Sequence, residues 1–142
     1  MSQTPLLSNT PFLYFLKLTS PVKVFNLPFQ LNNASKCKIT TVKYKTNTAN
    51  NDLLMIRING FNENIFFDGE KNHRCVKIIP LSNEANHIII YENHFTNDPD
   101  IEVNERPSNY GLTSLRVEAL IDFNLSNDIN DSNPLYIELK IW

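Results

Sequence analysis

Two segments in the last third of the chain alternate apolar and polar residues with a period of two, and this limits the possible folds most strongly. Their apolar positions are Leu115, Val117, Ala119, Ile121 and Phe123, and then Leu135, Ile137, Leu139 and Ile141. A period of two is that of a strand with one buried face. We therefore expect two long strands, at 115–123 and 135–142, with Val117, Ile121, Ile137 and Leu139 among the most buried residues.

The composition favours strands throughout the chain. Ala, the best helix former, occurs four times, whereas Asn occurs 21 times and Ile 14 times. Asn competes with the helical backbone, and Ile prefers strands. A length of 142 residues suits one domain, and a net charge of -2 speaks against a nucleic-acid coat. The chain is thus expected to be a single all-β domain.

Further strand-like segments precede these two. They span residues 12–18, 22–25 (extended as far as Pro28), 36–46, 53–58, 65–67, 74–81 and 87–92, with a short one at 101–103 inside the irregular stretch 93–111. Asn59-Gly60 predicts a tight hairpin joining 53–58 to 65–67. About eight strands without crossover helices indicate an antiparallel sandwich or barrel.

The N-terminal residues 1–11 are polar and contain Pro5 and Pro11, so we expect an extended arm before a domain that covers 12–142. The first 18 residues show no basic region and no small-residue cleavage site, which predicts a reducing compartment. Cys37 and Cys75 are then expected to be free, buried thiols in strands. Redox or metal chemistry at these cysteines is the alternative.

The histidines His73, His87 and His94 do not form a recognisable metal motif. A zinc site normally takes four Cys or His ligands at close spacing. His73 and Cys75 share a strand face, but nothing marks the thiol as an activated nucleophile. We predict no catalytic residue, no cofactor and no metal, and hence no enzyme.

Charged clusters leave two further alternatives open. The acidic residues Asp98, Asp100, Glu102 and Glu105, and then Asp128 and Asp131, lie in predicted loops. They are expected to be solvated turn residues, with a structural calcium ion as the alternative. Lys36 and Lys38 share one strand face, as do Lys43 and Lys45. A solvated face is expected there, and contact with phosphate or an acidic partner is the alternative.

Aromatic residues crowd the N-terminal third: Phe12, Tyr14, Phe15, Phe25 and Phe29. One small domain cannot bury all of them beside a single strand. Because aromatic side chains are enriched at protein interfaces, we expect some of them to contact another protein.

Length, strand pattern and the segments 53–58, 74–81, 87–92, 115–123 and 135–142, with the proline-containing arm before Phe12, resemble one group of proteins. These are the single-jelly-roll capsid components of large icosahedral DNA viruses and their satellites, the penton and small minor capsid proteins. Residue types with AT-rich codons (Phe, Tyr, Met, Ile, Asn, Lys) number 60, against 19 for Gly, Ala, Arg and Pro. That usage is typical of many such viruses.

The resemblance implies an antiparallel eight-stranded β-sandwich, a single jelly roll, in a structural virion protein made in the host cytoplasm. Such a protein forms homopentamers at fivefold vertices, or bridges neighbouring capsomers as a minor capsid or cement protein. Its partners are itself and other major or minor capsid proteins, with no nucleic acid, no membrane span and no cofactor. The rival interpretations are a lectin-like binding module that uses Tyr110, Asp98 and Asp100, and a cupin-like enzyme.

Overall fold

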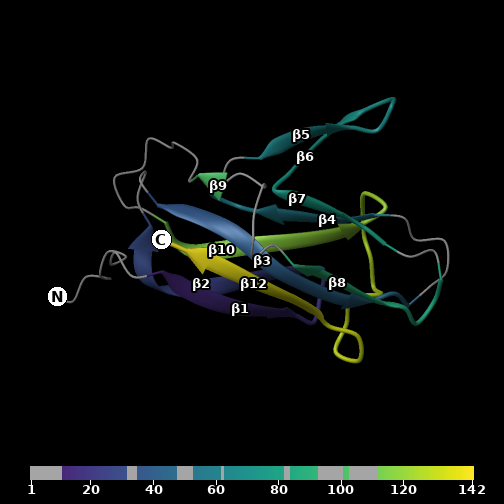
Figure 1. Cartoon of the computed structure of the whole chain (residues 1–142), viewed down its shortest axis with the longest axis horizontal. Helices are drawn as coiled ribbons and strands as arrows, with labels where there is room; N and C mark the ends of the chain where they lie inside the picture. Colours follow the sequence, from purple (N-terminus) through teal and green to yellow (C-terminus); the bar gives the residue numbers. More distant parts are fainter. Residues whose placement is uncertain are drawn as a thin grey trace.

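The computed structural model describes residues 11–31, 35–47, 53–61, 63–81, 84–92, 101–102 and 112–142. In these ranges the chain forms twelve strands and no helix, and every strand pair is antiparallel (Figure 1). The predicted all-β, antiparallel fold class is therefore confirmed. Residues 1–10, nearly all of the predicted arm, lie outside the described residues.

One sheet is built around the C-terminal strand. Its order is β1 (Phe12–Leu18), β12 (Leu135–Ile141), β3 (Lys36–Lys45) and β8 (Ile88–Glu92), and β9 (Ile101–Glu102) pairs with the start of β3. The first and last strands of the domain thus lie side by side. The predicted strands at 12–18, 36–46, 87–92 and 135–142 are confirmed to within one residue at each end.

The second sheet is built around the other alternating segment. Its order is β2 (Val22–Leu31), β10 (Leu112–Ile121), β4 (Leu53–Ile58) and β7 (Lys77–Pro80), and β11 (Asn124–Leu125) pairs with the end of β10. The 115–123 segment is a strand as predicted, but it ends at Ile121. Asp122 and Phe123 have positive φ angles of 50° and 67° and form the turn into β11.

Strand β2 is longer than predicted because a sheet edge tolerates its proline. Pro28 has no N–H to donate, which excludes it from central strands. β2 pairs only with β10, and its register shifts between Asn26 and Leu31, where Pro28 lies. Pro28 therefore lies where its missing N–H is not needed for a backbone hydrogen bond between β2 and β10.

The two sheets face each other across a shared apolar core. Inward side chains come from both sheets, among them Val117 and Ile121 on β10 and Ile137 and Leu139 on β12, and none of these four is more than 4% exposed. The predicted core residues are confirmed. At one edge Tyr14 on β1 reaches across to β2, where its hydroxyl donates to the Asn26 carbonyl at 2.7 Å.

A two-stranded hairpin, β5 (Asn64–Phe67) with β6 (Asn72–Cys75), stands apart from both sheets (Figure 1). The sequence predicted that 65–67 would return along 53–58 after an Asn59-Gly60 turn, and this was wrong. Both edges of β4 are already occupied, by β10 and β7. Gly60 has a positive φ of 95° but Asn59 does not, so the turn is not the hairpin type that needs both.

The predicted strand at 74–81 is also wrong as a single element. The chain bends at Val76, which separates β6 from β7 and takes them into different sheets. Val76 is 4% exposed, and its N–H donates to the Ile56 carbonyl at 2.9 Å. Burial of this apolar side chain fixes the bend. The strand count consequently exceeds the predicted eight.

Candidate functional site

His73 contacts one residue of the hairpin and one of the turn between β10 and β11. Its Nε2 lies 2.8 Å from Oδ2 of Asp68, and its ring stacks on Phe123 with centroids 3.9 Å apart. Asp68 Oδ1 also accepts the backbone N–H groups of Lys71 and Glu70, each at 2.7 Å. These hydrogen bonds, that from Lys71 foremost, hold the pKa of Asp68 well below its usual 3.8. The group closes the β5–β6 turn and ties it to the β10–β11 turn.

The two cysteines are free and buried, as predicted. Cys37 lies on β3 and Cys75 at the end of β6, so they belong to different sheets. Burial raises the pKa of the Cys75 thiol, and the negative charge of Glu63 adds to this. A reactive cysteine has a lowered pKa. Cys75 therefore lacks the electrostatic setting of an activated nucleophile.

His87, at the start of β8, is exposed and is engaged through its backbone. Its N–H donates to Thr46 Oγ1, and its carbonyl accepts the Thr46 N–H, both at 2.9 Å. His94, the third histidine, lies outside the described residues. Nothing in the structure brings His73 and His87 together.

The acidic clusters divide between described and undescribed parts of the chain. Asp98, Asp100, Glu105 and Tyr110 lie outside the described residues, and Glu102 is described only as backbone in β9. Across the described ranges, no group of three or more His, Cys, Asp or Glu side chains is placed to hold a metal ion.

Asp128 and Asp131 lie in a loop before β12 that its own asparagines hold in place. Oδ1 of Asn130 accepts the N–H groups of Ser132 and Asn133 at 2.9 and 3.0 Å. Nδ2 of Asn133 donates to the carbonyls of Lys45 and Asp128. Buried Ile129 anchors the loop to the core. The two aspartates thus belong to a tightly turned connection, as their loop composition predicted.

The two lysine pairs of 36–46, Lys36 with Lys38 and Lys43 with Lys45, lie on the same solvent-facing side of β3. A β-bulge at Thr40 places two β3 residues, Thr40 and Thr41, opposite Glu138 of β12. Thr40 is buried, and its Oγ1 donates to Oε1 of Glu138 at 2.6 Å. The bulge shifts the alternation by one residue, so Lys36 and Lys38 point outward together with Lys43 and Lys45. The sequence signal for it is the adjacent pair Thr40-Thr41, which interrupts the alternation.

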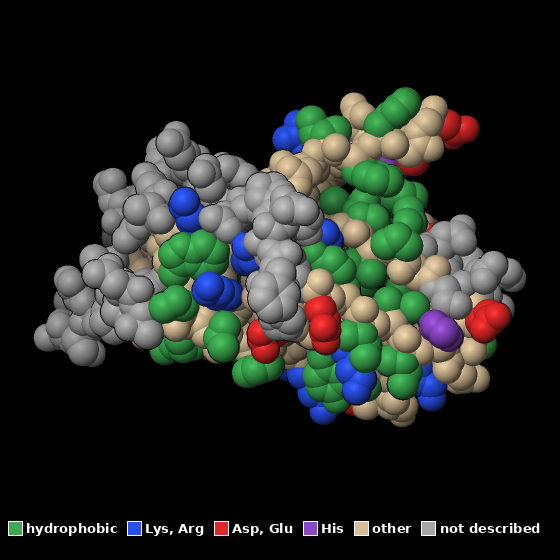
Figure 2. Space-filling view, in the orientation of Figure 1, with side chains coloured by type: hydrophobic (Ala, Val, Ile, Leu, Met, Phe, Trp, Pro, Cys, Tyr) green, Lys and Arg blue, Asp and Glu red, His purple; other side chains and the backbone are tan. Residues whose placement is uncertain are grey.

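The bulge completes a surface that we call the lysine face, the solvent side of the β1-β12-β3-β8 sheet. Its basic residues are Lys17, Lys36, Lys38, Lys43, Lys45 and Lys140, and its acidic residues are Glu92 and Glu138. Apolar side chains lie among them: Leu13, Phe15, Ile88, Ile90 and Tyr136 are 44–73% exposed. Figure 2 shows hydrophobic and basic side chains mixed over the molecular surface. A folded chain rarely gathers so many exposed apolar groups on one sheet without a partner.

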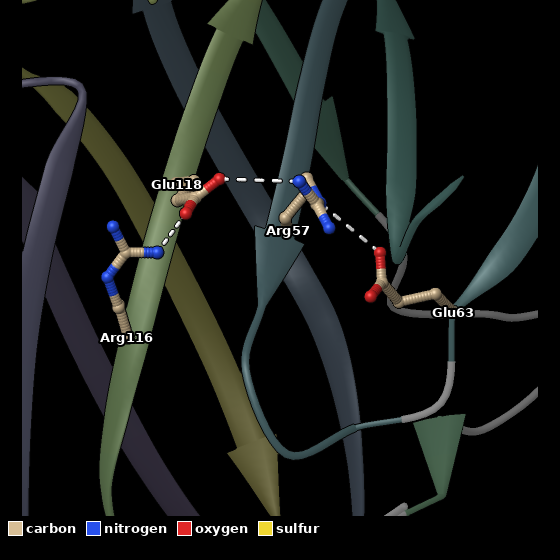
Figure 3. Close-up of polar contacts among 4 residues, drawn as sticks. All are labelled: Arg57, Glu63, Arg116 and Glu118. Carbon is tan, nitrogen blue, oxygen red and sulfur yellow. Dashed lines mark hydrogen bonds and ion pairs between the residues drawn. The ribbon is translucent and has the colours of Figure 1, made fainter. Parts of the chain in front are cut away.

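The outer side of the second sheet carries a row of alternating charges (Figure 3). Arg116 pairs with Glu118 on β10, Glu118 lies 3.6 Å from Arg57 on β4, and Arg57 lies 3.3 Å from Glu63. Glu118 and Arg57 are direct cross-strand partners. These four charges therefore pair with one another along the outer side of this sheet.

A comparison with protein-family models finds no match to this chain, and a comparison with the curated proteins finds none either. In the part of the chain that the structure describes, no helix is long and apolar enough to cross a membrane.

Proposed function

We propose that this protein is a structural component of an icosahedral virion, built on a single eight-stranded jelly roll, and that it assembles as a homopentamer at fivefold vertices. Neighbouring major or minor capsid proteins would be its other partners, and the virion its location. The strand order carries this proposal, and the lysine face supports it.

Support for the jelly roll comes from the strand order within the two larger sheets, when the separate β5–β6 hairpin and the two-residue strands β9 and β11 are left out. The eight remaining strands, numbered one to eight along the chain, form sheets of order 1-8-3-6 and 2-7-4-5. Consecutive strands alternate between the sheets except at the fourth and fifth. This order is the one expected for the double Greek key of a jelly roll, the architecture of many viral capsid domains, and it supports the proposal. β5 and β6 are then an insertion between the fourth and fifth strands.

The exposed apolar side chains support assembly rather than a monomeric state. Phe15 is 73% exposed and lies next to Leu13, at 52%, on the outer side of β1. These belong to the N-terminal aromatic and apolar cluster that the sequence predicted to be too large for one core. Apolar groups of this size become stable contacts when a second protein covers them.

Electron microscopy of the concentrated full-length protein tests the proposal. We expect ring-shaped particles with fivefold symmetry in class averages. Uniform monomers that attach only to the surface of preformed capsomers would instead indicate the cement role. Monomers that bind neither each other nor capsomers, together with a specific signal on a glycan array, would contradict the proposal and support the lectin-like module.

A further inference from the structure

The β5–β6 hairpin is a second surface that carries exposed apolar side chains. Ile65 and Phe67 lie two residues apart on β5 and are 62% and 63% exposed. The hairpin pairs with neither sheet, and an isolated two-stranded hairpin is marginally stable in water. In Figure 2 it projects from the body with hydrophobic side chains along it and acidic ones at its end.

Contacts at its turn and base hold the hairpin in this projecting position. The Asp68–His73 pair and the stacking of His73 on Phe123 fix the turn and β6, and the Arg57–Glu63 pair fixes the entry to β5. These contacts are made by side chains other than those of Ile65 and Phe67. The hairpin therefore keeps these two apolar side chains in a fixed position. Little conformational entropy is lost when another protein binds them, because the hairpin is already ordered.

The exposed apolar side chains concentrate on these two surfaces. The described residues include nine large exposed hydrophobic side chains: five on the lysine face, two on the hairpin, and Val24 and Leu125 elsewhere. Their distribution distinguishes two separate patches, one on the outer side of the β1-β12-β3-β8 sheet and one on the β5–β6 hairpin. A ring of identical subunits needs such a pair, because each copy contributes two different patches to its two neighbours.

Charge argues against a contact between two lysine faces. The six lysines and two glutamates of the face, together with Glu102 as the register partner of Lys36, give a formal charge of +3, so the rest of the chain carries -5 to reach the total of -2. Two lysine faces would repel, whereas a lysine face against another part of a second copy is attractive. The hairpin turn supplies Asp68 and Glu70, although Lys71 and Arg74 make its overall charge mixed.

We infer that the β5–β6 hairpin of one copy docks on the lysine face of the next, Ile65 and Phe67 covering Phe15 and its apolar neighbours. The inference rests on the proposed self-assembly and assigns the two halves of its contact. The aliphatic side chains Leu13, Ile88 and Ile90 favour a protein occupant, because nucleic-acid bases stack on aromatic rings instead.

Two double variants test the two halves of the proposed contact, the hairpin and the lysine face, one at a time. A hairpin variant carries Ile65→Ser and Phe67→Ser, and a face variant carries Phe15→Ser and Lys43→Glu. All four side chains are exposed, so both variants should keep the wild-type circular dichroism spectrum and melting temperature. Val24→Ser, 56% exposed on the other sheet, is the matched control.

The degree of assembly is measured by light scattering after size-exclusion chromatography. Each variant alone should require at least about a tenfold higher concentration to assemble than the wild type and the Val24→Ser control. A mixture of the two variants should form a one-to-one dimer, since one intact hairpin then meets one intact face. That dimer should weaken at high salt.

Variants that assemble like the wild type, or a mixture that stays monomeric, would overturn the inference while leaving the proposed function in place. A wild-type chain that never assembles would instead contradict the proposed function itself. Loss of oligonucleotide binding in the face variant, with unchanged assembly, would assign the lysine face to nucleic acid and also overturn the inference.

Discussion

At the scale of single residues, Tyr44 stands out because its hydroxyl is buried and has no hydrogen-bond partner among the described residues. Burial, with a smaller contribution from the charge of Asp128, raises the pKa of Tyr44 to about 12 from 10.0. A buried polar group without a partner costs free energy. Tyr44 thus places a polar hydroxyl in the core without a hydrogen bond to compensate for its burial.

Replacing Tyr44 with Phe should leave the free energy of unfolding unchanged or raise it by up to about 1 kcal/mol, because the unpaired hydroxyl is removed. The pH dependence should change as well. The raised pKa stabilises the wild type below pH 10, and this contribution is lost as the pH rises from 10 to about 12. Urea unfolding of both proteins across that range measures the difference, and a Phe variant more than about 1 kcal/mol less stable at neutral pH would reveal a hidden partner.

Asp68 should make the hairpin turn sensitive to acid. Its pKa is lowered in the folded chain, so the ionised carboxylate stabilises the turn above about pH 4, and this is lost as the pH falls below the unfolded value of 3.8. Hydrogen-exchange protection of the Glu70 and Lys71 amides should therefore decrease between pH 5 and pH 2. In Asp68→Asn, which cannot ionise, the protection of these amides should be lower and independent of pH. Protection equal to that of the wild type would show that the Asp68 carboxylate does not stabilise the turn.

At the scale of elements, period-two alternation was enough to predict β10, β12 and their buried faces. The alternation failed to predict the structure where contacts between strands distant in the sequence determine it. Asn59-Gly60 has the composition of a hairpin turn, but β10 and β7 occupy the edges that a returning strand would need. The split of 74–81 at Val76 and the bulge at Thr40 likewise depend on which neighbours each residue meets. Local sequence does not contain that information, although the Thr40-Thr41 pair hinted at the bulge.

The alternation on β12 makes a quantitative prediction. Leu139 is fully buried, so Leu139→Ala should lower the free energy of unfolding by about 2–5 kcal/mol through the cavity it opens. Leu13→Ala is the control: the same change at a position 52% exposed on the neighbouring strand should cost less than about 1 kcal/mol. Chemical denaturation of both variants gives the comparison, and equal losses would mean that the two faces are assigned incorrectly.

At the scale of the whole molecule, the candidate site is a pair of surfaces rather than a set of catalytic side chains. The sequence predicted an excess of N-terminal aromatics and a cluster of four lysines in two pairs, but it did not predict that other strands would add lysines to the same face. Only the bulge and the order of strands across the sheet bring Lys17 and Lys140 beside the four lysines of β3. A property distributed over four strands from both ends of the chain cannot be read from any one segment.

The central claim is that this antiparallel β-sheet protein works by assembling with copies of itself. Native mass spectrometry of the full-length protein at neutral pH and low salt, over a series of increasing concentrations, tests it most directly. The account predicts a complex of five times the 16.4 kDa chain mass that grows with concentration at the expense of the monomer. A spectrum that shows only the monomer at every concentration would contradict it.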